Sequence, residues 1–295
     1  MIRVKDCFLL RKGVIADQTE RKGKKMKKLL IASLIAITCN SVFAAEKGNA
    51  DVIFSKANQL YEAKNYTAAF QEIQRIAASG NAQAIYNLGS MTQQGLGTAK
   101  DEKKAFEYFQ DASNKGFGKA SYELAQIYQH GKNSIGINKD TQKYKTYLDK
   151  AAKQGSEEAS VEIATLLFAQ GKPEYDQLAM QQLRPLIKKN YYPAIHLKAL
   201  YDLSIGVKNK NPIMQQNAVS SIRSLATKGY VPSLMALGNM LANGNIVNQN
   251  LPEAKKIFTE LAAQNVPNAK ESLAKVEQAI AAQKAAPIAT QPPKK

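Results

Sequence analysis

The chain of 295 residues has no tryptophan, two cysteines and two histidines. Both cysteines, Cys7 and Cys39, lie in the first 44 residues, so the rest of the chain can form no disulfide. The histidines, His130 and His196, have no cysteine or acidic partner at ligand spacing. These absences favour neither a disulfide scaffold nor a metal site, and we expect no metal and no cofactor.

A membrane-spanning run is also missing. The apolar stretch Leu29–Ile37 is shorter than the about 20 residues that a membrane helix needs. It follows Met26, Lys27 and Lys28 and precedes small residues that end at Ala44, which is the layout of a bacterial secretory signal peptide. We therefore predict a signal peptide at 26–44, cleaved after Ala44, and a periplasmic or secreted protein with no transmembrane segment after signal removal.

The start of the chain has two further interpretations. Residues 1–25 precede the charged beginning of the signal peptide, so Met26 is the more natural initiator and 1–25 is interpreted as a start-site artefact. A lipoprotein anchor at Cys39 is the alternative to cleavage after Ala44. Ala36 and Thr38 fit a lipidation motif poorly.

Acidic residues are few: 24 Asp and Glu stand against 41 Lys and Arg. Without residues 1–44 the counts are 21 and 31, a net charge of +10. Outside the cytoplasm this excess favours contact with anionic envelope polymers, such as peptidoglycan or lipopolysaccharide, or with lipid headgroups, and we expect no nucleic acid partner. The alternative is a solvated surface that keeps the protein soluble, because no Lys/Arg block after residue 44 exceeds two residues.

Phosphate-binding loops are absent as well. Gly95 and Gly97 begin a glycine pattern, but a dinucleotide fingerprint needs a third glycine where Lys100 stands. The Gly-Lys-Ser/Thr of a P-loop is missing too.

The chain does contain an internal repeat, which is visible at six short junctions. Each junction ends in Gly or Asn, the residues that most readily adopt the left-handed conformation that closes a helix. They are Gly80, Gly116, Gly155, Asn190, Gly229 and Asn265.

Apolar residues recur at fixed distances on both sides of each junction, at helical spacing. Seven residues before the junctions stand Ile73, Phe109, Leu148, Leu183, Ile222 and Phe258. Four residues after them stand the small residues Ala84, Ala120, Ala159, Ala194, Ser233 and Ala269, and five further on Gly89, Ala125, Ala164, Ala199, Gly238 and Ala274. Each repeat therefore predicts a helix–turn–helix hairpin whose small residues allow close helix packing.

These hairpins predict an all-α fold: a right-handed α/α solenoid of about five to six repeats over residues 50–284, with a capping helix from Ala269 and a disordered tail at 285–295. In the turns, Asp101 is placed to cap the helix that follows, and Asp140, Asp176 and Asn250 hold the matching places. In the fourth repeat Lys198 stands where a core leucine is expected, which predicts a register shift toward Leu197 and Leu200.

The segment Asn81–Gly116 resembles the Sel-one-like repeat (SLR) family, a relative of the tetratricopeptide repeat. It carries Ala-x-x-x-Leu-Gly, Gly-x-Gly, Asp, Lys-Ala and a closing Gly. Phe117–Gly155 and Tyr230–Asn265 fit the pattern moderately, and Ser156–Gly229 fits it weakly.

The resemblance implies a concave groove that binds a protein or peptide. Its lining would be the residues two, six and nine after the anchoring small residue of each first helix. These are Tyr86, Ser90, Gln93, Tyr122, Gln126, Gln129, Val161, Thr165 and Phe168. Tyrosines with neighbouring hydroxyl and amide groups could hold an extended peptide. The alternative is that they are ordinary solvent-facing residues.

Enzyme motifs are weak, and we expect no catalytic residue. Ser272-Leu273-Ala274-Lys275 matches Ser-x-x-Lys, but no Lys-Thr-Gly accompanies it. Glu157 and Glu158 stand at a helix start, where they interact with the helix dipole. Three hypotheses result: an adaptor that captures a protein or peptide, a binder of anionic envelope polymer, and, as a weak third, a cell-wall hydrolase.

Overall fold

The computed structural model describes residues 50–285, with side chains from Val52 to Lys284. The predictions for the signal peptide, the first 25 residues and the C-terminal tail lie outside these residues, except for the helical Ala285. Within the described range there are thirteen α-helices, one short 3₁₀ turn, η1 (Asn133–Ile135), and one isolated β-bridge between Lys132 and Ile137. The predicted all-α fold is confirmed.

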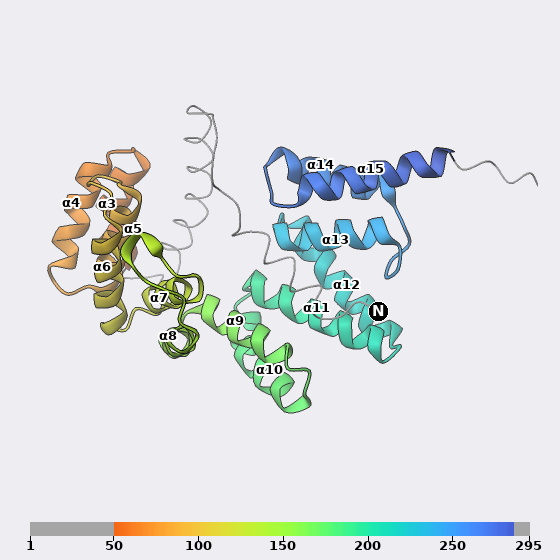
Figure 1. The fold of residues 1–295 in the computed structure, drawn as a ribbon, viewed down its shortest axis with the longest axis horizontal. Coiled ribbons are helices and arrows are strands. Elements are labelled where there is room, and N and C mark those ends of the chain that lie inside the picture. Colours follow the sequence, from red (N-terminus) through yellow and green to blue (C-terminus); the bar gives the residue numbers. More distant parts are fainter. Residues whose placement is uncertain (1–49, 286–295) are drawn as a thin grey trace, which may run out of the picture. The chain divides into compact units, whose positions relative to one another are not determined.

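The helices alternate as first and second members of hairpins (Figure 1). The first helices are α3 (Ala50–Glu62), α5 (Ala82–Gln94), α7 (Gly118–His130), α9 (Glu157–Phe168), α11 (Tyr192–Lys208), α13 (Val231–Asn243) and the terminal α15 (Ala269–Ala285). The second helices are α4 (Tyr66–Ala77), α6 (Glu102–Asn114), α8 (Thr141–Lys153), α10 (Pro173–Lys188), α12 (Pro212–Thr227) and α14 (Leu251–Ala263).

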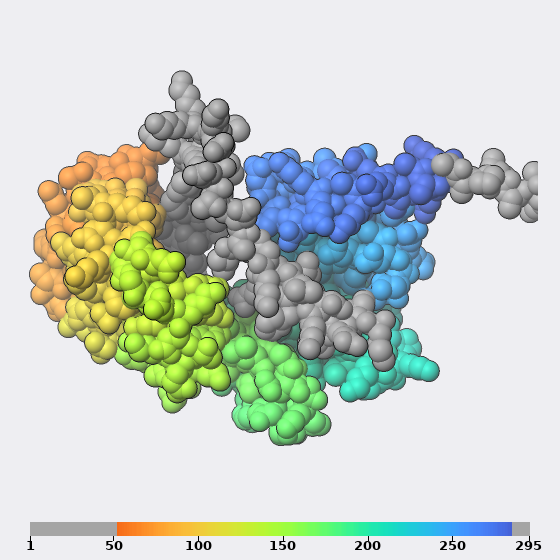
Figure 2. Space-filling model, in the orientation of Figure 1, coloured from red at the N-terminus to blue at the C-terminus, as the bar shows by residue number. Residues whose placement is uncertain are grey.

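The described residues form two compact units that divide between Ile163 and Ala164, within α9. In the unit before the division, α3 to α7 each pack against the next helix in the chain. In the unit after it, α10 to α14 do the same, and α15 also contacts α13. Figure 2 shows α14 and α15 as one continuous surface. Sequential contacts of this kind are the mark of a repeat protein.

The six junctions end their helices as predicted. Gly80, Gly116, Gly155 and Gly229 have φ between 76° and 91°, and Asn190 and Asn265 have φ of 57° and 54°. After all of them except Gly80, the next amide donates to a carbonyl of the preceding helix, for example Phe117 N to Ala112 O at 3.0 Å. Such left-handed ends satisfy carbonyls that the helix leaves unpaired.

Three of the four predicted caps are confirmed. Asp101, Asp140 and Asn250 accept hydrogen bonds from the amides of Lys104, Lys143 and Glu253. The prediction for Asp176 is wrong. The helix α10 starts earlier, at Pro173, because proline is favoured in the first turn of a helix, and Asp176 lies inside that turn.

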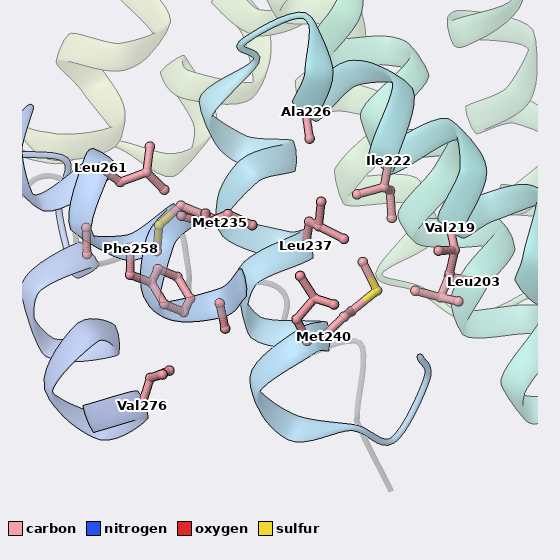
Figure 3. Close-up of a cluster of buried hydrophobic side chains, with 14 of the residues drawn as sticks. Leu203, Val219, Ile222, Ala226, Met235, Leu237, Met240, Phe258, Leu261 and Val276 are labelled. Atoms are coloured by element: carbon pink, nitrogen blue, oxygen red, sulfur yellow. The ribbon is translucent and has the colours of Figure 1, made fainter. Parts of the chain in front are cut away.

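In the second unit an apolar cluster runs through the consecutive helices α11 to α15. Figure 3 shows Leu203 of α11, Ile222 of α12, Leu237 of α13 and Phe258 of α14 pointing toward one another. In the first unit the predicted stripe residues Ile73 and Phe109 are likewise buried. Each hairpin therefore buries its apolar face against the next.

Two glycines sit directly against a phenylalanine of the same hairpin. A Cβ at Gly89 would lie 2.7 Å from Phe109 Cε1, and one at Gly238 would lie 2.7 Å from Phe258 Cζ. The hairpins with an alanine at the glycine position have Leu or Ile at the phenylalanine position. A large ring on the second helix thus requires a first helix without a side chain at the contact point.

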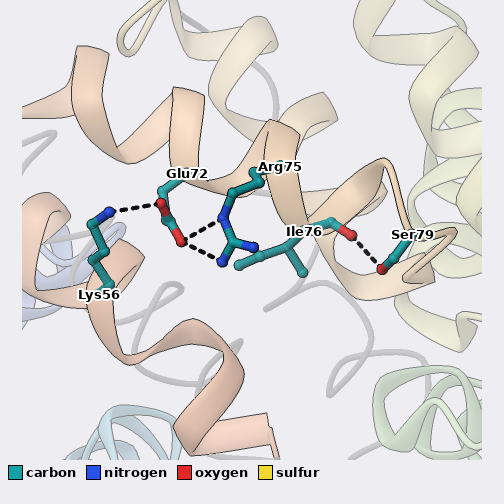
Figure 4. Close-up of polar contacts among 5 residues, drawn as sticks. All are labelled: Lys56, Glu72, Arg75, Ile76 and Ser79. Atoms are coloured by element: carbon teal, nitrogen blue, oxygen red, sulfur yellow. Dashed lines mark hydrogen bonds and ion pairs between the residues drawn. The ribbon is translucent and has the colours of Figure 1, made fainter.

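The first hairpin is also joined by a charged contact. Glu72 of α4 is only 8% exposed and pairs with Lys56 of α3 at 3.1 Å and with Arg75 at 2.7 Å (Figure 4). Hydrogen bonds from Arg75 and then from Lys56 lower the pKa of Glu72 below its usual value. The contact links α3 to α4.

The predicted register shift in the fourth repeat does not occur. Ala194 and Ala199 are buried at 0% and 3% exposure, as the unshifted register requires. Lys198 is half-buried and forms an ion pair with Asp202 one helical turn later. The lysine stem covers apolar surface while its charged end finds a partner, so the position tolerates a lysine.

Candidate functional site

The position two residues after the anchoring small residue was predicted to line a solvated groove, but Tyr86 is buried. Its side chain is 6% exposed, and its ring lies 5.5 Å from Phe109 and 5.1 Å from Phe117. Phe117 immediately precedes α7, the next first helix. Stacking of hairpins brings successive first helices together, so this position faces the neighbouring repeat and not the solvent.

Three other predicted residues converge on one carboxylate, Glu162 of α9, which is 6% exposed. From α7, Tyr122 Oη donates to Glu162 Oε2 at 2.7 Å, and Gln126 Nε2 donates to the same oxygen at 3.0 Å. Gln129 Nε2 donates to Glu162 Oε1 at 3.4 Å. A fourth donor is Tyr144 Oη of α8, at 2.9 Å from Oε1. We call these five residues the Glu162 cluster.

The Glu162 cluster satisfies a buried carboxylate with four neutral donors. Hydrogen bonds to an ionised acceptor are stronger than those between neutral groups, and a carboxylate has room for about four of them. The arrangement ties α7, α8 and α9 together. Tyr122, Gln126 and Gln129 therefore make contacts within the protein, and each side chain stays partly exposed.

The remaining predicted residues are Ser90 and Gln93 on α5 and Thr165 on α9, and all three side chains are partly exposed. Val161 and Phe168 are buried, and Phe168 stacks on Tyr201 with ring centroids 4.0 Å apart. Of the predicted lining residues, Tyr86, Val161 and Phe168 are thus buried, and the other six keep partly exposed side chains. No contact joins Ser90 or Gln93 to the Glu162 cluster among the interactions of the described residues.

The same position in the second unit is held by His196 of α11. His196 Nδ1 lies 2.8 Å from Oγ of Ser233, the fully buried anchoring residue of α13. Its ring meets that of Tyr230, just before α13, at 5.5 Å and 71°. Burial lowers the pKa of His196 to about 4. With this pKa the imidazole is neutral near pH 7. Like Tyr86 and Tyr122, the His196 side chain connects one first helix to the next.

The lowered pKa of His196 predicts a loss of stability in acid. An unfolded histidine has a pKa of about 6.5, so as the pH falls from about 6.5 to 4 the unfolded chain takes up a proton that the folded chain does not. We expect this to remove about 1–3 kcal/mol of folding free energy in that window. Chemical denaturation at pH 7, 5.5 and 4.5 measures it.

The matched controls for that experiment are His196→Gln and His130→Gln. His196→Gln should flatten the dependence by the stated amount, whereas His130→Gln, at the exposed end of α7, should leave it in place. An unchanged slope in His196→Gln would contradict the assignment.

The sequence signals for the Glu162 cluster were a tyrosine and a glutamate at unusual positions. Tyr144 stands where the other repeats have Ala69, Ala105, Ala179, Ala218 and Ala254. Glu162 stands three residues after its anchoring alanine, as does Glu123 in the preceding repeat. Burial, and then the nearby Glu158, raises the pKa of Glu123. The sequence did not predict that Tyr144 and Glu162 interact, because the residues that meet in this cluster are 18 to 40 positions apart in the chain.

No group of three His, Cys, Asp or Glu side chains in residues 50–285 is placed to hold a metal ion. None of the helices in that range is long and apolar enough to cross a membrane. Ser272 and Lys275 of the Ser-x-x-Lys motif lie on α15, where Lys275 pairs with Glu271 at 2.8 Å.

These features define an all-α repeat protein built from stacked helical hairpins. Comparison with known families adds the kind of repeat: the chain carries Sel1 repeats at 82–117, 118–156 and 231–266. They coincide with α5–α6, α7–α8 and α13–α14. The three segments with the better resemblance are confirmed as Sel1 repeats. Sel1 repeats form a scaffold that typically mediates protein interactions.

One curated relative is the human protein sel-1 homolog 2, which is 35% identical over 136 residues. The match covers 45% of this chain and 19% of the human protein, so the chain spans about a fifth of that relative.

Two solved structures share the fold. A Sel1 repeat protein from Oxalobacter formigenes aligns with a TM-score of 0.59 at 21% identity, over 81% of this chain and 99% of that one. A protective antigen of uropathogenic Escherichia coli that displays an SLR fold aligns with a TM-score of 0.55 at 20% identity, over 82% of this chain and 58% of that one. At this level of identity the likeness shows the fold alone.

Proposed function

We propose that this protein is a binding scaffold that works outside the cytoplasm and captures a protein or peptide partner on the exposed parts of its first helices. The observation that carries the proposal is the run of similar hairpins in which three are Sel1 repeats. Each hairpin contributes one first helix, so a partner can contact several repeats at once. The signal-peptide pattern at 26–44 supports a periplasmic or secreted location.

In this proposal the Glu162 cluster has a structural role, as do the contacts of Tyr86 and His196 with the next repeat. They fix the spacing of neighbouring first helices, and with it the spacing of the exposed side chains between them. Ser90 and Gln93 are partly exposed predicted lining residues of the first unit that lie outside the Glu162 cluster. Polar side chains of this kind can hydrogen-bond the backbone of a bound peptide.

Site-specific crosslinking in cells tests the proposal. A photoreactive amino acid replaces Ser90 or Gln93 on α5, and in matched controls it replaces Lys103 or Glu107, two exposed residues of the second helix α6. We expect protein adducts from the α5 positions at least fivefold more abundant than from the α6 positions. We also expect to find the crosslinked protein in the periplasmic or secreted fraction. Its mass should be that of a chain whose N-terminus is Ala45.

Equal adducts from α5 and α6 would argue against a binding face on the first helices. Adducts found only in the cytoplasm, on unprocessed chain, would contradict the location.

A further inference from the structure

The positive charge of the described residues is concentrated in one part of the chain. Residues 50–285 contain 28 Lys and Arg and 20 Asp and Glu, a net charge of +8. The segment 177–252, which spans most of α10 through α13, contains eight of these cations and a single acidic residue, Asp202. Its net charge is therefore +7. The excess noted in the sequence belongs almost wholly to one segment of the second unit.

Two cations of this segment take part in ion pairs between described residues. Lys198 pairs with Asp202, and Arg223 lies 3.8 Å from Glu253 of α14. Arg184, Lys188 and Lys228 are exposed. Exposed cations without a compensating carboxylate create a positive potential that attracts an anionic partner.

Two turns of this segment bring cations and tyrosines together. Lys228 follows α12, and its Nζ lies 5.5 Å from the ring centre of Tyr192, which starts α11. Lys188 is the last residue of α10, four positions before Tyr192 in the chain. The Tyr192 ring meets Tyr230 at 6.0 Å and 73°. We call Arg184, Lys188, Tyr192, Lys228 and Tyr230 the basic edge. Both tyrosines are half-buried, so each offers part of its ring to the surface.

We propose that the basic edge binds an acidic polypeptide segment, one rich in Asp and Glu. The inference rests on the proposed protein-binding function and names the chemistry of the partner. Charge complementarity selects carboxylates, and tyrosines supply rigid contact area for the chain between them. A polypeptide is favoured over a polyanionic glycan because Sel1 repeats typically mediate protein interactions.

The test measures binding of the full chain to a labelled 20-residue peptide of alternating Glu and Ala, with a Gln–Ala peptide as the neutral probe. The edge variant is Arg184→Gln, Lys188→Gln, Lys228→Gln. The control variant, Lys103→Gln, Lys139→Gln, Lys145→Gln, removes the same charge from three exposed lysines of the first unit. At 0.15 M salt the Debye length is about 8 Å, so the two variants report on different surfaces.

We expect the edge variant to weaken Glu–Ala binding about tenfold and the control variant less than twofold. Equal losses in both variants would show that net charge alone binds the peptide, and would overturn the proposal. Absence of Glu–Ala binding, or binding of a heparin fragment that is tighter and depends on the same edge, would also overturn it. Partner adducts at Ser90 or Gln93 that persist in the edge variant would leave the proposed function standing while this inference fails.

Discussion

Replacing Glu162 with alanine should lower the free energy of unfolding of the segment α7–α9 by about 2–4 kcal/mol. The change removes the acceptor of four hydrogen bonds, from Tyr122, Gln126, Gln129 and Tyr144. Tyr144 is buried, so its hydroxyl would lose its acceptor away from water. The other three are partly exposed, and water can replace part of their loss. Hydrogen exchange of the α7–α9 amides and urea denaturation measure the effect.

Two variants bracket that result. Tyr144→Phe removes one of the four donors, and we expect a loss of about 1 kcal/mol. Lys145→Ala, one residue away on the exposed side of α8, should change stability by less than about 0.5 kcal/mol. If Glu162→Ala were as mild as Lys145→Ala, the cluster would not hold these helices together.

The second large effect is expected at the contact between Gly238 and Phe258. Phe258 is fully buried, and Phe258→Ala should cost about 3–5 kcal/mol. Gly238→Ala places a methyl group 2.7 Å from the ring, and we expect a net cost of about 1–2 kcal/mol even after the gain in helix propensity. Phe258→Leu alone should cost about 1–2 kcal/mol.

The double variant distinguishes size complementarity from independent effects. Gly238→Ala combined with Phe258→Leu recreates the Ala and Leu pair that other hairpins use, such as Ala125 with Leu148. We expect its loss to be at least about 1 kcal/mol smaller than the sum of the two single losses, because residues in contact do not act additively. Chemical denaturation of the full chain gives all four values. Strict additivity would refute the pairing.

The bridging residues explain how this repeat array is held at its first helices. At one repeat position Tyr86 supplies a ring, Tyr122 a hydroxyl and His196 an imidazole, and each meets a residue at or near the next first helix. Different chemistry therefore solves the same packing problem in successive repeats. A partner that binds the first helices contacts a surface whose spacing these bridges set.

Sequence reasoning succeeded where structure depends on neighbours in the chain. Asn190 and Asn265 adopt a left-handed φ because their helices end there. Asp101 and Asp140 cap their helices by accepting a hydrogen bond from the amide three residues later in the chain. It failed at Asp176, where Pro173 begins the helix earlier.

By itself the sequence determined the repeated helical hairpin, most of the helix ends and the buried stripes, because these follow from helical periodicity and local hydrogen bonding. Only the tertiary structure decided which side chains face a neighbouring repeat. Tyr122 and Glu162 are 40 residues apart and meet because two first helices stack side by side. The rotation of one helix against the next sets that meeting, and it depends on the packing of all side chains between them.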